Sequence, residues 1–125
     1  MGVLDGFELV SEASKPFITL RERTITFSKS SVEELGFPAF VLMYVNRKER
    51  KVAFRASENT PDSIAFYKKP KEGLPVLVRI SDKKKASMLA EIAGVEASDK
   101  GIRFYGEFFR DEKIICFDLS EPVYQ

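Results

Sequence analysis

Few side chains in this sequence could carry out chemistry, and the missing types exclude the most common sites. The 125 residues include no His and a single Cys. Without His there is no Ser–His or Cys–His nucleophile pair, and the most common metal ligand is absent. One Cys without His cannot form a zinc cluster, and no glycine-rich phosphate loop of standard spacing occurs. The sequence therefore predicts no enzyme activity, no metal and no cofactor.

One spacing resembles a catalytic motif. Ser81 and Lys84 form Ser-x-x-Lys, as in penicillin-binding nucleophiles. The partner motifs of that chemistry are missing, and Ser81 precedes an apolar stripe at helical spacing, which favours a helix N-cap. Cys116 lies within an apolar run, which favours a buried, unreactive thiol.

The start of the chain and its apolar runs bear on location. The first ten residues have neither the basic stretch nor the apolar stretch of a secretory signal. No apolar run approaches the roughly 20 residues that cross a bilayer. Together with the lone Cys, these features predict a cytoplasmic protein without a membrane partner.

Basic side chains are concentrated in the middle of the chain. The net charge is +1, yet residues 15–85 hold 16 Lys and Arg against 8 Asp and Glu, and both flanking segments are acidic. This distribution is typical of nucleic-acid contact, although solvated Lys-rich turns have the same composition. The candidate nucleic-acid contacts are Arg21, Arg23, Lys29, Arg47, Lys48, Arg50, Lys51, Lys68 and Lys69.

Aromatic residues gather near the C-terminal end of the sequence, where two roles stay open. The residues are Phe104, Tyr105, Phe108, Phe109 and Phe117. Together on an open face, such rings could form a stacking platform for single-stranded nucleic acid. Alternating Phe in strands usually faces the core, however, and the acidic charge of this region opposes a phosphate backbone. We therefore expect most of these rings in the core.

The elements that would position these side chains begin with residues 17–27. Their alternation indicates one half-buried strand, or two short strands joined by a charged turn. Ser30 or Ser31, each three residues before a Glu, has the spacing of a capping box. Gly36 is a natural helix end, and Pro38 prevents continuation. A short helix of about two turns is expected between them.

The rest of the chain predicts a hairpin and then the same order of elements again. Residues 40–45 and 51–56 are β-rich and flank a charged turn, as in a β-hairpin. Residues 64–67 indicate a short strand between two loops. The second half predicts a strand at 75–80, a helix capped by Ser81 and ended by Gly94, and a hairpin of 102–109 with 114–119.

These patterns predict an α+β protein in which residues 1–125 form a single domain. Two β-α-β-β-like halves, at 16–57 and 75–120, would form a small barrel or a mixed antiparallel sheet with two helices. A true duplication and a chance recurrence of the element order both fit the sequence.

Residues 25–36 read Ile-Thr-Phe-Ser-Lys-Ser-Ser-Val-Glu-Glu-Leu-Gly and are followed by the hairpin that reaches Ala56. This stretch resembles the swapped-hairpin unit of AbrB/MazE-type regulators and antitoxins, over residues 23–56. Phe27-Ser28-Lys29 stands at the strand-to-helix step, and Leu35-Gly36 matches the helix end. The family usually has Gly-Arg before the strand and Pro before the Lys, whereas this chain has Arg23-Thr24 and Ser28.

The resemblance implies an intertwined β barrel built from two such units, in one chain or in two paired chains. It also implies a DNA or toxin partner, with Arg21, Arg23 and Lys29 nearest to a DNA-facing edge. Two hypotheses follow for the whole chain. The first is a non-catalytic interaction or regulatory module that binds a protein partner or itself, as a homodimer, through exposed strand edges. The alternative is nucleic-acid binding, as in AbrB-like transcriptional regulators, through the basic middle region.

Overall fold

The computed structural model describes residues 2–7 and 15–125. The fold is α+β, and its antiparallel sheet closes nearly into a small barrel. The strands are β1 (Phe17–Leu20), β2 (Thr24–Phe27), β3 (Phe40–Asn46), β4 (Lys51–Ser57), β5 (Ile64–Ala65), β6 (Val78–Ser81), β7 (Ile102–Phe109), β8 (Ile114–Asp118) and β9 (Val123–Tyr124), and the helices are α1 (Lys29–Leu35) and α2 (Lys83–Ala93). The predicted fold class is therefore confirmed.

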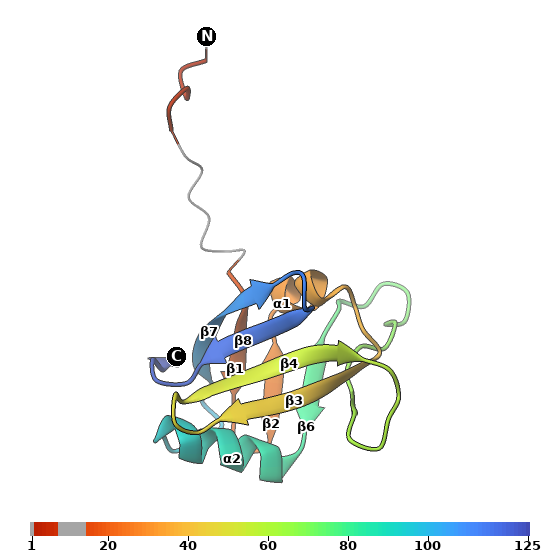
Figure 1. Ribbon diagram of the computed structural model, residues 1–125, viewed down its shortest axis with the longest axis vertical. Coiled ribbons are helices and arrows are strands. Elements are labelled where there is room, and N and C mark those ends of the chain that lie inside the picture. The colour runs from red at the N-terminus through yellow and green to blue at the C-terminus, as the bar shows by residue number, and fades with distance from the viewer. Residues whose placement is uncertain (1, 8–14) are drawn as a thin grey trace.

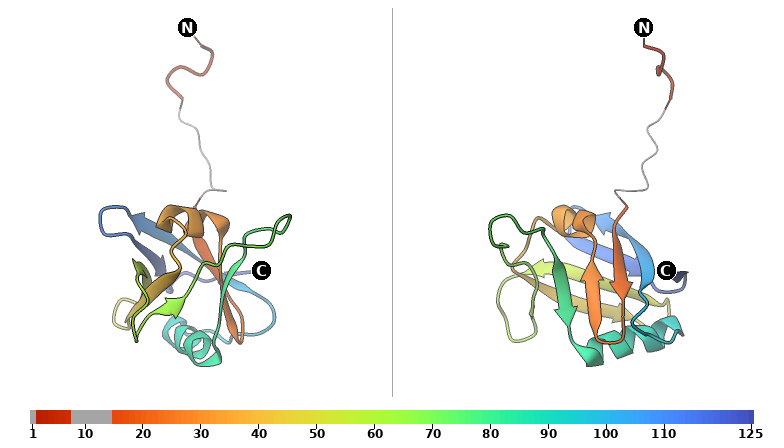
Figure 2. Two further views of the ribbon diagram at one scale, coloured as in Figure 1. Left: turned by 90° about the vertical axis from the view of Figure 1, so that its right-hand side faces the viewer. Right: turned by 180° about the vertical axis from the view of Figure 1, so that it is seen from behind.

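The barrel has two walls, and a helix lies at each end. Strands β3, β4 and β8 form the wall nearest the viewer in Figure 1, and α1 and α2 lie at opposite ends of the barrel. Strands β6, β2, β1 and β7 lie side by side in the other wall, which faces the viewer in the right-hand view of Figure 2. Strand β7 joins the walls, because it pairs with β1 and with β8.

Both helices are capped one to three positions away from where the sequence motifs place their caps. Ser28, rather than Ser30 or Ser31, caps α1 and accepts a hydrogen bond from the amide of Ser31. Ser31 is instead fully buried, and its hydroxyl donates to the carbonyl oxygen of Phe17 in β1. Asp82 caps α2 in place of Ser81, which ends β6. The capping residue is the last one with extended backbone, and β2 and β6 run directly into their helices.

The helix ends and the hairpins agree with the sequence predictions. Gly36 and Gly94 end their helices in the left-handed conformation. Strands β3 and β4 pair along their full lengths, as do the facing parts of β7 and β8. The predicted strand at 75–80 is shorter, since β6 begins at Val78.

Aromatic rings occupy the middle of the core. Phe27 makes edge contacts with Phe54, Phe66 and Phe117, with ring centroids 4.8–6.2 Å apart. These rings come from β2, β4, β8 and the residue after β5, and all four are at most 7% exposed. The apolar stripe of α2 closes one end of this core.

The order of strand pairing is almost unchanged when the two halves of the chain are exchanged. The strands follow the order β5-β3-β4-β8-β7-β1-β2-β6. Exchanging β1 to β4 with β5 to β8 recovers every neighbouring pair except β1–β2, whose counterpart would be β5–β6. Strands β5 and β6 are the two ends of the order, so the barrel stays open at the missing pair.

The register of the β4–β8 ladder is also preserved when the two halves are exchanged. Val52 pairs with Phe117 and Phe54 pairs with Ile115, so the β4–β8 ladder maps onto itself when β4 and β8 change places. Strands of one half thus lie between strands of the other, and the two halves share one core.

Candidate nucleic-acid interface

The nine predicted contact residues are divided between the two ends of the barrel. Arg21 and Arg23 lie in the β1–β2 turn, which reaches the α2 end because the amide of Glu22 donates to the carbonyl of Ser98, just beyond α2. The β3–β4 turn, which carries Arg47, Lys48 and Arg50, approaches the same helix (Figure 1). Lys51 follows it as the first residue of β4.

Lys29, Lys68 and Lys69 lie at the α1 end. Lys29 begins α1 and pairs with Glu33 at 3.7 Å. Lys68 and Lys69 follow Tyr67, whose ring packs against Phe37 just beyond α1. The predicted set therefore does not form one continuous surface.

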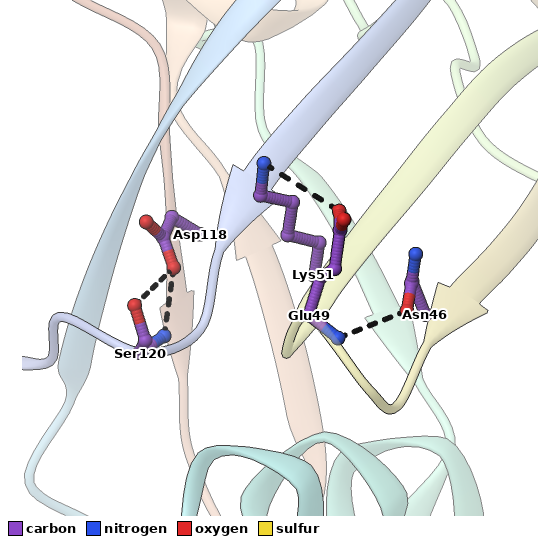
Figure 3. A network of polar contacts seen from close by, with 5 residues as sticks. All are labelled: Asn46, Glu49, Lys51, Asp118 and Ser120. Carbon is purple, nitrogen blue, oxygen red and sulfur yellow. Dashed lines mark hydrogen bonds and ion pairs between the residues drawn. The ribbon is translucent and has the colours of Figure 1, made fainter.

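Several basic residues of the β3–β4 turn are engaged within the chain. Arg50 donates to the carbonyl oxygens of Ile92 and Ala93 at the end of α2. Arg47 pairs with Glu91 at 3.8 Å on the exposed side of the same helix. In Figure 3, Lys51 reaches back to Glu49. These contacts make the turn part of the structure that holds α2.

The second residue group of Figure 3 lies at the end of β8. Asp118 accepts hydrogen bonds from the amide and hydroxyl of Ser120. These bonds hold the pKa of the Asp118 carboxyl below its usual value, with a smaller contribution from nearby Lys51. The carboxylate is therefore ionised at neutral pH.

A different set of arginines lies on one face of the barrel. Thr26 pairs with Arg79 on one side and with Thr19 on the other, and Thr19 pairs with Arg103. Their strand neighbours such as Ile25 are buried, so this row points outward from β6, β2, β1 and β7. With the strands about 4.8 Å apart, the backbones of Arg79 and Arg103 are roughly 14 Å apart.

Two further arginines extend this row toward the α2 end. Arg21, Arg23 and Arg79 border one surface hollow, together with Thr24, Glu22 and Asp99. We call the four arginines Arg21, Arg23, Arg79 and Arg103, with the threonines between them, the arginine face. Thr19 and Thr26 lie between Arg79 and Arg103 in the row, and Thr19 is buried.

The arginines of the arginine face form no close ion pair with the acidic residues that border it, Glu22 and Asp99. Within residues 2–7 and 15–125, none of its four guanidinium groups has a carboxylate oxygen within 4.0 Å, whereas Lys29, Arg47, Lys51 and Lys85 all do. Thr26 Oγ1 and Arg103 Nε are buried and lack a hydrogen-bond partner in the described part of the chain. Buried polar atoms are usually paired, so these two atoms are exceptions in this part of the barrel.

The sequence analysis missed Arg79 and Arg103. Arg79 lies between two buried residues of a short strand, and Arg103 begins an aromatic hairpin. Their alternation with apolar neighbours signals an outward position, but no local pattern shows that β6 and β7 flank β2 and β1. Of the predicted set, only Arg21 and Arg23 belong to the arginine face.

The aromatic residues of the second half divide between core and surface. Phe104 and Phe117 are fully buried and Phe108 packs against the core, as predicted for most of them. Tyr105 is only partly buried, on the outer side of β7, and Phe109 is 47% exposed.

Cys116 differs from its prediction, because it is only half-buried. It faces outward between the buried residues Ile115 and Phe117. Partial burial raises the pKa of its thiol, so the side chain is mainly protonated at neutral pH.

Metal ligation and membrane crossing find no support in the described ranges. Among residues 2–7 and 15–125, no group of three His, Cys, Asp or Glu side chains is arranged to hold a metal ion. Neither helix found there has the length and apolar character needed to cross a membrane.

Comparisons with protein-family models, with curated proteins and with solved structures gave no match for this chain.

Proposed function

We propose that this chain is a non-catalytic binding module whose ligand is a nucleic acid. The observation that carries the proposal is the arginine face, where four arginines without an ion pair in the described residues lie on one face of the barrel, with threonines between Arg79 and Arg103. Arg and Thr are typical phosphate contacts, and guanidinium groups bind phosphate oxygens in pairs. Glu22 and Asp99 lie at one end of the arginine face. The phosphate backbone of the nucleic acid would therefore run toward β7, away from these two carboxylates.

Charge-matched variants test this function. Arg21→Ala with Arg79→Ala removes two charges from the arginine face, and Lys68→Ala with Lys69→Ala removes two from the α1 end. Fluorescence anisotropy with labelled oligonucleotides should show at least tenfold weaker binding at low salt for the first variant. The slope of log K against log salt should also become shallower, by roughly 0.7–0.9 for each lost phosphate contact.

The lysine variant should change both quantities much less. Equal losses in the two variants would show that charge alone attracts the ligand. No binding by the unaltered protein at low salt would refute the function.

A second candidate function is self-association through the edge of β3. Strand β5 pairs only with Phe40 and Val41, and the carbonyl of Ala39 accepts from the amide after β5. The N–H and C=O groups of successive residues alternate between the two sides of a strand. Those of Met43 and Val45 therefore point to the same side of β3 as the carbonyl of Ala39, beyond the end of β5. No partner for these groups occurs among the described residues.

This edge is suited to pairing with a second copy of the chain. In an antiparallel pairing centred on Tyr44, Met43 of one copy would exchange hydrogen bonds with Val45 of the other. Tyr44 is 49% exposed and Val45 is 37% exposed, so both side chains have surface to bury. A groove of about 480 Å³ lies beside the edge, with Met88 of α2 on its far side.

Light scattering across a range of concentrations tests the pairing. We expect a dimer that Val45→Pro abolishes, because Pro lacks the outward amide and is tolerated at a strand edge. Val45→Thr, which keeps the amide, should remain dimeric. A monomer at all concentrations would rule out this second function.

A further inference from the structure

Two aromatic rings lie on the outer surface directly beside the arginine face. Phe17 of β1 and Tyr105 of β7 pair across the two strands, and their ring centroids are 5.6 Å apart. Their strand neighbours Ile18 and Phe104 are fully buried, so these two rings point the other way. Neither ring is part of the hydrophobic core or packs against it.

Cations cover this aromatic pair. The guanidinium of Arg103 lies over the Phe17 ring, with Cζ 3.9 Å from the centroid, and its Nη1 donates to the Tyr105 hydroxyl at 3.3 Å. The ammonium of Lys15 lies 5.2 Å from the Tyr105 centroid. Arg103 thus belongs both to the arginine face and to the aromatic pair. Tyr105 lies two residues, or about 7 Å, beyond Arg103 along β7, and Phe17 lies opposite Tyr105 on β1.

A groove continues from Tyr105 across the outer side of β7. It has a volume of about 500 Å³, and its apolar lining includes Tyr105, Phe109 and Val123. Tyr105, Glu107 and Phe109 alternate along the outer side of β7, so the exposed Glu107 side chain lies between the two rings. The groove therefore offers an aromatic surface at Tyr105 with carboxylates close to it.

The charged groups of the groove indicate which part of a nucleotide would enter it. Its lining also includes the carboxylates Glu107, Asp118 and Glu121 and the ammonium groups of Lys15 and Lys51. Carboxylates repel phosphate but accept hydrogen bonds from base amino groups. A base is therefore favoured inside the groove, with its phosphate outside, toward Lys15 and Arg103.

We propose that the ligand is a single-stranded nucleic acid, and that one of its bases stacks on the Tyr105 ring with its amino edge in the groove. The inference rests on the proposed function, because the arginine face supplies the phosphate contacts. Duplex bases are stacked inside the helix and cannot reach these rings, whereas an unpaired base can.

Binding by the full chain is measured with labelled 20-nucleotide oligo-dC, oligo-dT and a mixed-sequence duplex of the same length. We expect single strands to bind at least tenfold tighter than the duplex, and oligo-dC tighter than oligo-dT, which lacks an amino group. Tyr105→Leu should weaken single-strand binding by about 5- to 100-fold. Tyr105→Phe keeps the ring and should retain the affinity.

Controls separate this inference from the function on which it rests. Tyr105→Leu removes the hydroxyl that accepts from Arg103, yet it should weaken duplex binding far less than single-strand binding. The duplex binding that remains shows that the variant is folded. Since the chain has 4 Tyr and no Trp, quenching of Tyr fluorescence by oligo-dC reports stacking, and Tyr105→Leu should reduce it. Equal affinity for duplex and single strand, unaffected by Tyr105→Leu, would overturn the stacking proposal and leave the arginine face intact. Tighter binding of oligo-dT would overturn the placement of the amino edge, and no binding to any oligonucleotide would overturn both proposals.

Discussion

The guanidinium of Arg50 completes the C-terminal end of α2 from a distant part of the chain. Its Nε donates to the carbonyl of Ile92 at 3.1 Å, and a second nitrogen donates to the carbonyl of Ala93. The last carbonyls of a helix have no partner inside the helix, and a cation suits the negative end of the helix dipole. Arg50 is therefore a structural residue that joins the β3–β4 turn to α2.

Removing this side chain should destabilise the fold. Arg50→Ala is expected to lower the free energy of unfolding by about 1.5–3 kcal/mol, because two charged hydrogen bonds are lost. Lys113→Ala is the matched control, since Lys113 holds the same place in the β7–β8 turn, with φ of 55° against 57° at Arg50. Urea unfolding should show a clearly smaller loss for the control, and equal losses would contradict the capping role.

Asp82 connects stability to pH at the other end of α2. Its carboxylate accepts from the Lys85 ammonium at 2.7 Å and from the Lys85 amide at 3.2 Å. These bonds lower the pKa of Asp82, and the bond from the Lys85 ammonium has the larger effect. A carboxyl with a lowered folded pKa contributes stability that is present above its unfolded pKa, about 3.9, and is lost as the pH falls through the folded value.

Asp82→Asn tests this dependence, because Asn still caps a helix but carries no charge. The variant should unfold more easily than the unaltered protein at pH 7, and the difference should shrink as the pH falls below about 4. Chemical unfolding at several pH values measures this difference. A stability difference between the two proteins that grows as the pH falls would contradict a lowered pKa of Asp82 in the folded protein.

At the scale of elements, β7 changes partner in the middle of the strand. Residues 102–105 pair with β1 and residues 106–109 pair with β8. Gly106 lies at the change, where a Cβ atom would lie 2.6 Å from Phe117 Cδ1 and against the carbonyl of Cys116. A side chain at this position would therefore collide with the neighbouring strand.

Gly106→Ala should therefore strain the barrel. The added methyl meets backbone as well as a fully buried ring, so we expect a loss of about 1–3 kcal/mol in the free energy of unfolding. Gly2→Ala is the control, because the nearest atom to its added methyl is 3.5 Å away, at an exposed Asp5. Thermal unfolding in which Gly106→Ala matches the unaltered protein would show that β7 and β8 can separate freely.

At the scale of the whole molecule, the two halves complete each other. Strand β2 pairs with β6, β1 with β7, β4 with β8 and β3 with β5, so four ladders join one half to the other. The β3–β4 and β7–β8 turns also make equivalent contacts in the two halves. The amide of Leu119 donates to the carbonyl of Arg50, and the amide of Ala56 donates to the carbonyl of Lys113. Neither half can bury its apolar strand faces by itself.

Fragments of the chain should show this dependence. Residues 16–57 alone should give the poorly dispersed NMR spectrum of an unfolded chain while monomeric, since their β1, β2 and β4 edges lack partners. Addition of a fragment of residues 58–125 should restore a dispersed spectrum. A folded monomer of residues 16–57 would show that the halves are independent, contrary to the ladders.

Much of this arrangement could be predicted from the sequence, though not its exact boundaries. Alternation located both hairpins, and Gly36 and Gly94 located the helix ends, because these signals are local. The caps were misplaced by one to three residues, since more than one residue near each helix start is chemically suitable: Ser28, Ser30 and Ser31 at α1, and Ser81 and Asp82 at α2. Which residue caps each helix depended on where the preceding strand ends. The resemblance to AbrB/MazE-type units stays a prediction.

The sequence by itself determined the α+β class, the order of the main elements and most of the residues that face the core, since periodicity and turn residues act over a few positions. Only the tertiary structure decided that Arg79 and Arg103 stand in one row with Thr19 and Thr26, while Arg50 belongs to a helix end. The physical reason is that the row is assembled by strand pairing between distant segments. Such pairing depends on how two interleaved halves fill one common core.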